Sequence, residues 1–380
     1  YYGAFNKIGK LFIWNNTLNK LRKIKKNNMK KLLINLFIVF FGVLSLDFFF
    51  GKYFIPHEET LFRIRHKIFH HGLEKNFSTK KAYWVNGHYE YHTDNNGFKT
   101  SKKKSKIINN FSNILILGDS MSEGSGVIYE KTYTGIIDEK FKDIEFSNAS
   151  AASYAGSIYL SKIKYLINQN YKFDHLLIHL DISDVWDDYF RYDYENGIAH
   201  DLGKNKNVRD YYLNMLTVNL PNTHRVFSYL RNLSLAKIKT NDILNMEAGQ
   251  FVYDNNLGFN NLNERDLAFN KTFNFLSEIH NILKQKNIKF SILIVPWPST
   301  LANAKENNYF TDKIEKFCEN RCDNFVNTFQ IFFNINKDKG LDYTIKKYFF
   351  VNEKDHHLNE EGHSIVAQAL IDKIKNSNSW

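Results

Sequence analysis

The chain has 380 residues, of which 43% are hydrophobic and 16% are aromatic. This composition is ample for a packed core and excludes a globally disordered protein. The formal net charge is +11, but nine of the 51 Lys and Arg residues and none of the 40 acids lie within residues 1–31. The rest of the chain is therefore nearly neutral, which argues against a nucleic-acid-binding protein.

The N-terminal region has the pattern of a membrane anchor. Residues 1–31 are basic, and in the 19 residues at 32–50 only Asn35 and Asp47 are strongly polar. Such a length can cross the hydrocarbon core of a bilayer. The preceding Lys and Arg residues predict a cytoplasmic N-terminus, with the remainder outside the cytoplasm (the periplasm in a Gram-negative cell). No small-residue cleavage site follows, so we interpret the stretch as an uncleaved transmembrane signal anchor. A buried core helix is the alternative.

The body of the chain begins with a juxtamembrane segment at residues 51–110, which is rich in His, Lys and aromatic residues and lacks clear periodicity. From residue 113 onward, apolar runs alternate with amphipathic stretches, which is the pattern of a parallel α/β sheet. Residues 111–380 are therefore predicted to form one α/β domain. We expect its strands at residues 114–117, 144–147, 176–180, 290–295 and 325–327.

Helices are expected between these strands. Apolar residues share one helical face within residues 133–141, 158–167 and 276–283. A terminal helix is predicted to begin after Asn359, which is a good N-cap residue and is followed by two acids in the first turn.

The alternation of strands and helices breaks at residues 185–264. This interval includes several expected helices, and it begins with five aromatic residues, Trp186, Tyr189, Phe190, Tyr192 and Tyr194. We interpret it as a helical insertion over the carboxyl edge of the sheet, where it forms a lid or a substrate wall. Ordinary peripheral helices are an equally good interpretation.

Cys318 and Cys322 are the two cysteines of the chain. Outside the cytoplasm, where conditions are oxidising, this close pair is able to form a disulfide. Bridge geometry would be poor if both lay within one regular helix, so a helix ending between them would favour the bridge. A zinc site is disfavoured because two thiols do not complete a zinc coordination shell.

Gly118-Asp119-Ser120 directly follows the apolar run at residues 114–117. A serine at the C-terminal end of a central strand lies in the crevice where open α/β sheets bind ligands. Serine is a weak nucleophile until a base takes its proton. His357, near the other end of the chain, is the candidate base, and Asp355 is the nearest carboxylate that could orient it.

These two motifs resemble blocks of the SGNH (GDSL-like) hydrolase superfamily. Gly-Asp-Ser at residues 118–120 is similar to the first block, which carries the nucleophile. Asp-x-His-Leu-Asn-x-x-Gly-His at residues 355–363 is similar to the last block, which carries acid, base and following helix. The resemblance covers about residues 110–375. It implies a three-layer α/β/α fold with a flavodoxin-like parallel sheet, and serine chemistry without a cofactor. Metal catalysis is disfavoured because the 14 histidines show no compact ligand motif.

The chain departs from the family pattern in the last block. The commonest members space acid and base as Asp-x-x-His, whereas Lys354 here leaves Asp355 and His357 as an Asp-x-His pair. This spacing resembles that of some surface-polysaccharide members. Glu353 with His356 is the competing pair. We interpret His363 as a structural residue of the terminal helix.

The resemblance also implies an oxyanion hole. The backbone N–H of Ser120 supplies one donor. The second family block offers the N–H of a glycine that follows an asparagine, and here Ser153 stands at the glycine position after Asn148. The third block supplies an asparagine side chain from Gly-x-Asn-Asp. Residues 181–184 read Asp-Ile-Ser-Asp instead, so Ser183 is the candidate donor, with a shorter reach.

We therefore predict a membrane-anchored, extracytoplasmic serine esterase or O-acyltransferase that acts on an acylated glycan. The anchor and the resemblance, rather than any single residue, indicate the glycan. The alternative is a non-catalytic glycan-binding or assembly protein that keeps the hydrolase fold, which the missing third-block asparagine motivates. Trp297, which follows a predicted strand, could line a sugar site, with structural packing as the other interpretation.

Overall fold

The computed structural model describes residues 28–51, 62–84, 87–102, 112–202, 220, 222–223, 257–350, 357–377 and 380. The chain divides into two compact units. The smaller consists of Tyr1–Pro56 and Lys206–Lys237, and the larger of His57–Asn205 and Ile238–Trp380. The predicted domain boundaries themselves stay a prediction.

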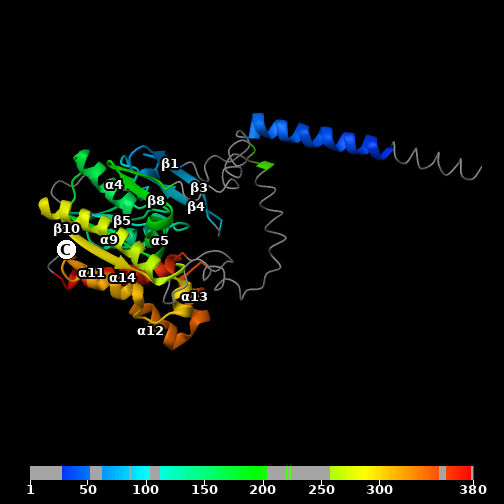
Figure 1. Ribbon diagram of the computed structural model, residues 1–380. Coiled ribbons are helices and arrows are strands. Elements are labelled where there is room, and N and C mark those ends of the chain that lie inside the picture. Colours follow the sequence, from blue (N-terminus) through cyan, green and yellow to red (C-terminus); the bar gives the residue numbers. More distant parts are fainter. Residues whose placement is uncertain are drawn as a thin grey trace, which may run out of the picture. The chain divides into compact units, whose positions relative to one another are not determined.

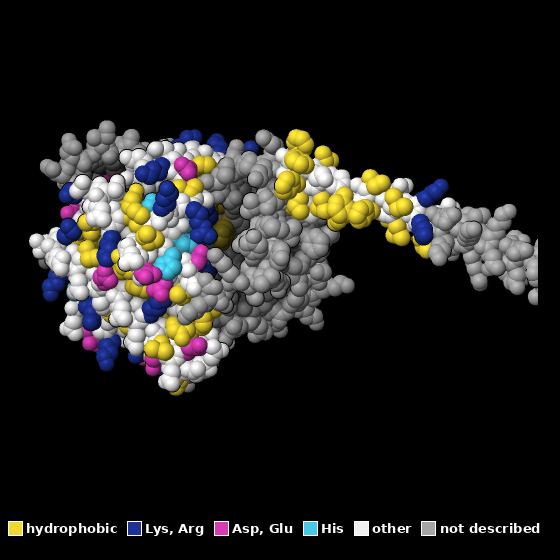
Figure 2. All heavy atoms as spheres, turned by 45° about the horizontal axis from the view of Figure 1, so that its top comes forward, with side chains coloured by type: hydrophobic (Ala, Val, Ile, Leu, Met, Phe, Trp, Pro, Cys, Tyr) yellow, Lys and Arg dark blue, Asp and Glu magenta, His cyan; other side chains and the backbone are white. Residues whose placement is uncertain are grey.

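The described part of the smaller unit is mainly the apolar helix Asn28–Gly51, which has 24 residues and contains an 18-residue window with a mean hydropathy of 2.3. It is long and apolar enough to cross a bilayer. Figure 2 shows hydrophobic side chains along this helix and basic side chains at one end. The carboxylate of Asp47 accepts hydrogen bonds from the backbone N–H groups of Asn222 (3.2 Å) and Thr223 (2.6 Å). A helix of the expected length and composition is therefore present, and its membrane topology stays a prediction.

The larger unit is built on a five-stranded sheet in which every pair of neighbouring strands is parallel. The spatial order is β11-β10-β7-β5-β6, so the strands, numbered along the chain, lie as 2-1-3-4-5, the flavodoxin-like order. The sheet and its flanking helices confirm the predicted α/β/α class (Figure 1). All five predicted strands are present, as β5 Ser112–Leu117, β6 Ile144–Asn148, β7 His175–His179, β10 Lys289–Ile294 and β11 Asn324–Asn327.

Alternation along the strands divides the core into two layers. Leu115 and Leu117 of β5 face one apolar cluster, whereas Ile114 and Ile116 face the other. The first cluster is covered mainly by α4 Gly156–Asn168, α5 Ile182–Phe190, α9 Leu262–Gln285 and α11 Tyr309–Cys318. The second is covered mainly by α3 Tyr133–Lys140, α10 Pro298–Asn303, α12 Phe329–Lys339, α13 Leu341–Tyr348 and α14 Glu360–Lys375. Two short helices, α2 Ser120–Glu123 and η2 Tyr129–Lys131, follow β5.

Two antiparallel hairpins precede the sheet, in the segment where the sequence showed no periodicity. They pair β1 Arg63–His66 with β2 His70–Leu73, and β3 Ser78–Trp84 with β4 Gly87–His92. These strands were missed because their polar and apolar residues do not alternate regularly. The β3–β4 register also shifts between Thr79 and Ala82, which interrupts the period of two.

The expected helical insertion is described only at its start. Its aromatic residues lie on α5 and on a third hairpin, β8 Tyr192–Glu195 with β9 Ile198–Asp201. Tyr192 is buried, and the other four aromatic side chains pack partly buried against the core. The hairpin was not anticipated, and the choice between a lid or substrate wall and ordinary peripheral helices stays a prediction. Residues 203–219 and 224–256, on which most of the lid prediction falls, lie outside the described residues.

Cys318 and Cys322 form a disulfide in the structure. Helix α11 ends at Cys318, and a turn carries the chain to Cys322, whose N–H donates to the Cys318 carbonyl at 3.0 Å. The helix therefore ends between the two cysteines, which is the arrangement that a bridge requires.

Asn359 should be a main determinant of the stability of α14. Its Oδ1 accepts from the N–H of Gly362 at 3.0 Å, and its Nδ2 donates to the carbonyls of Lys347 and Phe349 at 3.0 and 3.1 Å. We expect Asn359→Ala to lower the free energy of unfolding by about 1–2 kcal/mol. Asn359→Asp keeps the cap but loses both donated bonds, so its loss should be intermediate.

Chemical unfolding followed by circular dichroism checks this expectation. Asn376→Ala at the exposed C-terminal end of the same helix is the matched control, with an expected change within about 0.5 kcal/mol. Equal losses in Asn359→Ala and Asn376→Ala would contradict the role given to the cap.

Candidate active site

Ser120 lies where β5 ends and α2 begins. The Asp119 side chain caps α2 by accepting from the N–H of Met121 at 2.8 Å. Gly118 lets the chain turn here, because an added Cβ would lie 2.2 Å from Ser122 Oγ and 3.1 Å from His179 Cβ. Ser120 is half-buried, so its hydroxyl can face a ligand while the turn beneath it is packed.

His357 approaches Ser120 from the loop before α14. Its Nε2 lies 2.7 Å from Ser120 Oγ, across 237 residues of sequence. The N–H of Phe350 donates to the His357 carbonyl at 2.9 Å, and Asn359 caps the helix that follows. The structure thus brings the predicted serine and histidine within hydrogen-bond distance.

The carboxylate predicted to orient His357 cannot be placed. Asp355, together with the competing pair Glu353 and His356, falls in residues 351–356, outside the described residues. The role of Asp355 therefore stays a prediction.

The position of Ser120 in the sheet agrees with ligand binding. Strand β5 lies between β6 and β7, and the chain runs from β5 to β6 on one side and then to β7 on the other. The gap between β5 and β7 is therefore the topological switch point, where α/β sheets bind ligands outside the carboxyl ends of their strands. Ser120 follows β5, and Asp181 follows β7.

Three buried carboxyl groups gather at this switch point. Oxygens of Asp119, Asp181 and Asp184 lie within 4.8 Å of one another. Burial, and then the neighbouring carboxylates, raise the pKa of Asp119 and of Asp184 well above the usual range. The group has the donor set of a cation site, but the raised pKa values mean that protons can balance its charge instead.

Trp297 belongs to the same interior cluster. Its indole Nε1 donates to Asp181 Oδ2 at 3.3 Å, and only 1% of the residue is exposed. The ring therefore cannot present a face to a sugar, and the packing interpretation is the correct one. His363 is likewise buried, and its Nδ1 accepts from the N–H of Tyr133 at 3.3 Å.

Ser183, the candidate donor from the third block, already has a partner. Its hydroxyl and its N–H both contact Asp181 Oδ1, at 2.5 and 2.7 Å, because Asp181 is the N-cap of α5. The residue is half-buried. Its hydroxyl would have to leave Asp181 before it could donate to an oxyanion.

Ser153, the candidate donor from the second block, occupies a position that favours glycine. The N–H of Tyr154 donates to the Ala151 carbonyl at 3.2 Å, which closes a β-turn with Ala152 and Ser153 at its centre. Ser153 has a φ of +62°, whereas Ala152 is not among the residues with positive φ. This combination is a type II turn, which demands a left-handed residue at its third position and usually has Gly there. Ser153 thus has a backbone conformation that a glycine would adopt without strain.

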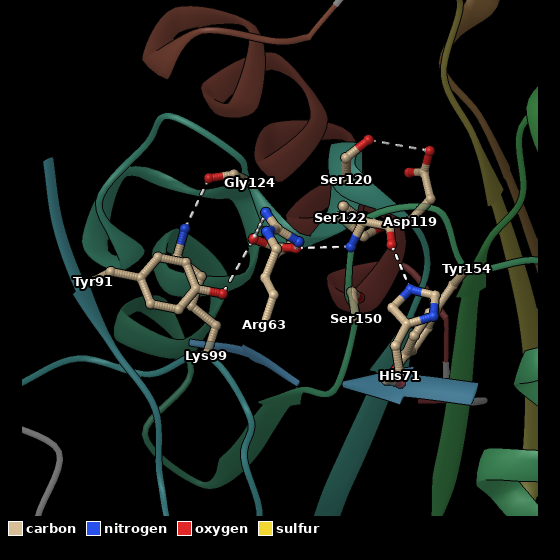
Figure 3. A network of polar contacts seen from close by, with 12 residues as sticks. Arg63, His71, Tyr91, Lys99, Asp119, Ser120, Ser122, Gly124, Ser150 and Tyr154 are labelled. Carbon is tan, nitrogen blue, oxygen red and sulfur yellow. Dashed lines mark hydrogen bonds and ion pairs between the residues drawn. The ribbon is translucent and has the colours of Figure 1, made fainter. Parts of the chain in front are cut away.

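A buried charge network lies beneath this turn. Glu123 accepts a bidentate ion pair from Arg63, with both distances at 2.7 Å, and a hydrogen bond from the Tyr91 hydroxyl at 3.2 Å. It also accepts from the N–H of Ala152 at 2.8 Å. Figure 3 shows Arg63 and Tyr91 converging on this point below Ser120. Sequence reasoning missed these residues because Arg63 and Tyr91 precede the sheet by many residues.

Two buried lysines hold loops around the nucleophile. Lys99 donates to the carbonyls of Gly124 and Val127 at 2.8 and 2.6 Å, just after α2. Lys162 donates to the Ala149 carbonyl at 2.7 Å, just before the turn that contains Ser153. Burial lowers the pKa of each to about 7. No sequence signal distinguishes them from surface lysines.

A second serine–histidine pair lies in the interior. Ser122 Oγ contacts His179 Nδ1 at 2.8 Å and the Tyr133 hydroxyl at 2.7 Å. Ser122 has no exposed surface, and burial lowers the pKa of His179 to about 4. This pair cannot reach a ligand, so it serves the packing beneath Ser120.

The β3–β4 hairpin adds an aromatic wall. The Trp84 ring lies edge-on to the His357 ring, with centroids 5.0 Å apart. Gly126 leaves room for the indole, because a Cβ there would lie 2.6 Å from Trp84 Cδ1. Trp84 is half-buried.

Comparisons with known proteins give structural likenesses only. No protein-family model matches the chain, and no curated protein matches its sequence. A psychrotrophic esterase from Pseudoalteromonas sp. is similar at 15% identity and a TM-score of 0.37, covering 70% of this chain and 97% of that one. An acetylxylan esterase from Geobacillus stearothermophilus is similar at 13% identity and a TM-score of 0.38, with coverages of 70% and 95%. A member of the lipolytic G-D-S-L family from Veillonella parvula shows 10% identity, a TM-score of 0.40 and coverages of 70% and 100%. At these values the function must be argued from the site.

The carboxyl cluster predicts a pH effect on stability. The pKa of Asp184 is raised above its ordinary 3.8 in the folded state, so above that pH the folded chain binds more protons than the unfolded chain. The stability that this group contributes therefore falls as the pH rises from there towards the folded pKa. Asp184→Asn cannot lose a proton, so it should gain stability relative to the wild type as the pH rises.

Chemical unfolding at about pH 5 and about pH 8 measures this gain, which should reach at least about 1 kcal/mol, since one pKa unit corresponds to about 1.4 kcal/mol. Asp342→Asn, whose side chain is 81% exposed, should show no comparable pH dependence. A difference between Asp184→Asn and the wild type that stays constant with pH would refute the raised pKa.

The left-handed backbone of Ser153 predicts which substitutions are tolerated. Ser153→Gly should change stability by no more than about 0.5 kcal/mol, because relief of the left-handed conformation offsets the greater unfolded-state entropy of Gly. Ser153→Val should destabilise by about 1–2 kcal/mol, since β-branched residues rarely adopt positive φ. Thermal unfolding compares both with Ser364→Val, at an exposed site on α14. A Ser153→Val loss no larger than that control would count against a strained turn.

Proposed function

We propose that the protein is a serine esterase or O-acyltransferase of the SGNH type. The observation that carries this proposal is the 2.7 Å contact between Ser120 Oγ and His357 Nε2 at the switch point of the sheet. A serine is activated when a base lies within hydrogen-bond reach. The Gly-Asp-Ser motif and the likeness to esterases agree with this chemistry.

In the proposed reaction, Ser120 Oγ attacks the carbonyl carbon of an ester while its proton passes to His357 Nε2. The tetrahedral intermediate collapses as the C–O bond to the alcohol breaks, and the departing oxygen takes the proton from Nε2. Water or a sugar hydroxyl then gives its proton to Nε2 and attacks the acyl-enzyme. The bond between the acyl carbon and Ser120 Oγ breaks, and Oγ takes the proton back from Nε2. Asp355 would hold the Nδ1 proton of His357 and stabilise the imidazolium. Water as acceptor gives hydrolysis, and a sugar hydroxyl gives transfer.

The oxyanion would be held by the N–H groups of Ser120 and Ser153. Main-chain donors suit this task because they need no side-chain reorganisation. Ser153 supports the assignment through its turn, which has the conformation of a glycine-containing type II turn. Ser183 would be a third donor only if its hydroxyl turned away from Asp181.

The substrate proposed is an acylated glycan outside the cytoplasm. The apolar helix Asn28–Gly51 supports membrane attachment, and the basic residues before it support a cytoplasmic N-terminus. The half-buried Trp84 beside His357 gives the site an aromatic surface, which suits the C–H faces of sugars as well as apolar acyl chains.

One observation favours a second candidate, a glycan-binding or assembly protein without catalysis. The Ser183 hydroxyl is bound to Asp181, and the asparagine of the third block is missing. Loss of one oxyanion donor costs about 2.7–4 kcal/mol in other enzymes, which is enough to make turnover very slow.

We expect Ser120→Ala to lower the turnover of p-nitrophenyl acetate by about 10³-fold or more, because Ser120 Oγ is the attacking atom in the proposed reaction. Full-length protein in detergent micelles is used. A fluorophosphonate probe should label the wild type at Ser120. Ser122→Ala, which alters the interior serine–histidine pair, is the matched control and should still be labelled at Ser120.

Product analysis with a sugar acceptor separates transfer from hydrolysis. A wild type that neither turns over esters nor takes the label, but binds an acetylated glycan as well as Ser120→Ala does, would replace the enzyme by the non-catalytic candidate.

A further inference from the structure

We propose that His71 is a positioning residue for the oxyanion hole, acting through the peptide group between Ala152 and Ser153. This inference rests on the proposed function, because it gives that peptide N–H a catalytic task. It concerns a residue of the β1–β2 hairpin, which precedes the sheet in the chain.

The contact joins His71 to the other end of the same peptide group. His71 Nε2 lies 2.7 Å from the Ala152 carbonyl oxygen. That carbonyl and the N–H of Ser153 belong to one planar unit, so the direction of one sets the direction of the other. Figure 3 shows the His71 ring pointing into the loop below Ser120 and Asp119. A hydrogen bond to the carbonyl therefore aims the N–H that is proposed to meet the oxyanion.

The peptide group between Ala152 and Ser153 needs a contact that holds its orientation. Type I and type II turns differ by a flip of their central peptide, which reverses the direction of its N–H. Gly at the third position favours type II, whereas Ser153 has a φ of +62° there. A left-handed conformation costs an L-residue about 1–2 kcal/mol, which shifts the balance toward the flipped turn. The bond from His71 would break on flipping, so it opposes that shift.

The other described contacts of this loop do not oppose a flip of the central peptide. Glu123 accepts from the N–H of Ala152, which belongs to the preceding peptide group. A flip of the central peptide changes mainly ψ of Ala152 and φ of Ser153, so the contact with Glu123 can survive it. The bond between the Tyr154 N–H and the Ala151 carbonyl is common to both turn types. Among the described contacts of this loop, the one between His71 and the Ala152 carbonyl depends on the orientation of the central peptide.

The neighbours of His71 determine its tautomer. A carbonyl only accepts, so Nε2 of His71 must carry the proton, and Nδ1 of the neutral ring is then an acceptor. His70 Nδ1 lies 2.7 Å from His71 Nδ1 and must therefore donate. His70 Nε2 in turn lies 2.6 Å from Arg65 Nη1 and 3.2 Å from Asp201 Oδ1. Burial lowers the pKa of His71 to about 4, so this ring is neutral near pH 7.

The ring itself is held in place. The Tyr154 hydroxyl donates to the His71 carbonyl at 2.8 Å, and the two rings meet edge to face with centroids 5.0 Å apart. A phenylalanine at position 71 would keep the ring packing and lose both the hydrogen bond to the Ala152 carbonyl and the contact with His70. His71→Phe is therefore compared with His71→Gln, which restores an N–H donor.

The test compares His71→Phe, His71→Gln and the wild type in full-length protein, using p-nitrophenyl acetate turnover and the rate of fluorophosphonate labelling. We expect His71→Phe to lower kcat by about tenfold or more, which is less than the 10²–10³-fold loss from removing a direct oxyanion donor. KM should change by less than about threefold, because the bond matters mainly to the transition state. His71→Gln keeps an N–H donor and should recover most of the lost kcat. His280→Phe, the same change at a half-buried histidine of α9, is the matched control.

A double-mutant cycle tests whether His71 acts by stabilising the type II turn. In a Ser153→Gly background, His71→Phe should cost much less kcat than in the Ser153 background, because Gly holds the type II turn without help. A merely structural role of His71 would give the same cost in both.

The outcomes separate the two proposals. If the wild type is active and Ser120-dependent while His71→Phe keeps its kcat, or loses it equally in both backgrounds, the role of His71 is refuted and the proposed function stands. If the wild type neither turns over esters nor takes the label, the proposed function fails and this inference fails with it.

Discussion

The site depends on one contact, which joins the carboxyl end of a central strand to a loop near the other end of the chain. Ser120 follows β5 and His357 lies in the loop between α13 and α14, yet these two residues, 237 positions apart, lie 2.7 Å from each other. A hydrogen bond of this length tolerates little movement. Helix caps on both sides supply the necessary rigidity, with Asp119 at the start of α2 and Asn359 at the start of α14.

The interior behind Ser120 is unusually polar. Asp119, Asp181, Asp184 and Glu123 are all buried there, and Lys99 is buried close by. Buried ionisable groups are costly unless they are paired or hydrogen-bonded, and partnered groups hold their neighbours in defined positions. Glu123 does this for the turn at residue 152, and Lys99 does it for the loop after α2. The buried polar groups therefore hold the loops around Ser120 in fixed positions.

The segment before the sheet, which its composition indicated only as a juxtamembrane segment, contributes residues that surround the site. It supplies Arg63 to Glu123, Trp84 to the face of His357, and His71 to the turn that holds Ser153. These hairpins complete the surroundings of the site, although they contribute no strand to the central sheet. Under the proposed function, they shape the oxyanion hole and the substrate wall of an otherwise simple α/β fold.

The sequence by itself determined the apolar N-terminal helix, the five parallel strands and the cap at Asn359. It also singled out Ser120 and His357, because strand and helix periods report local burial and the two motifs have recognisable residue types. Only the tertiary structure decided the roles of Glu123 and His71, the left-handed turn at Ser153, and the burial of Trp297. The physical reason is that a hydrogen-bond partner or a peptide orientation depends on which distant segment packs against it. A local sequence pattern does not contain that information.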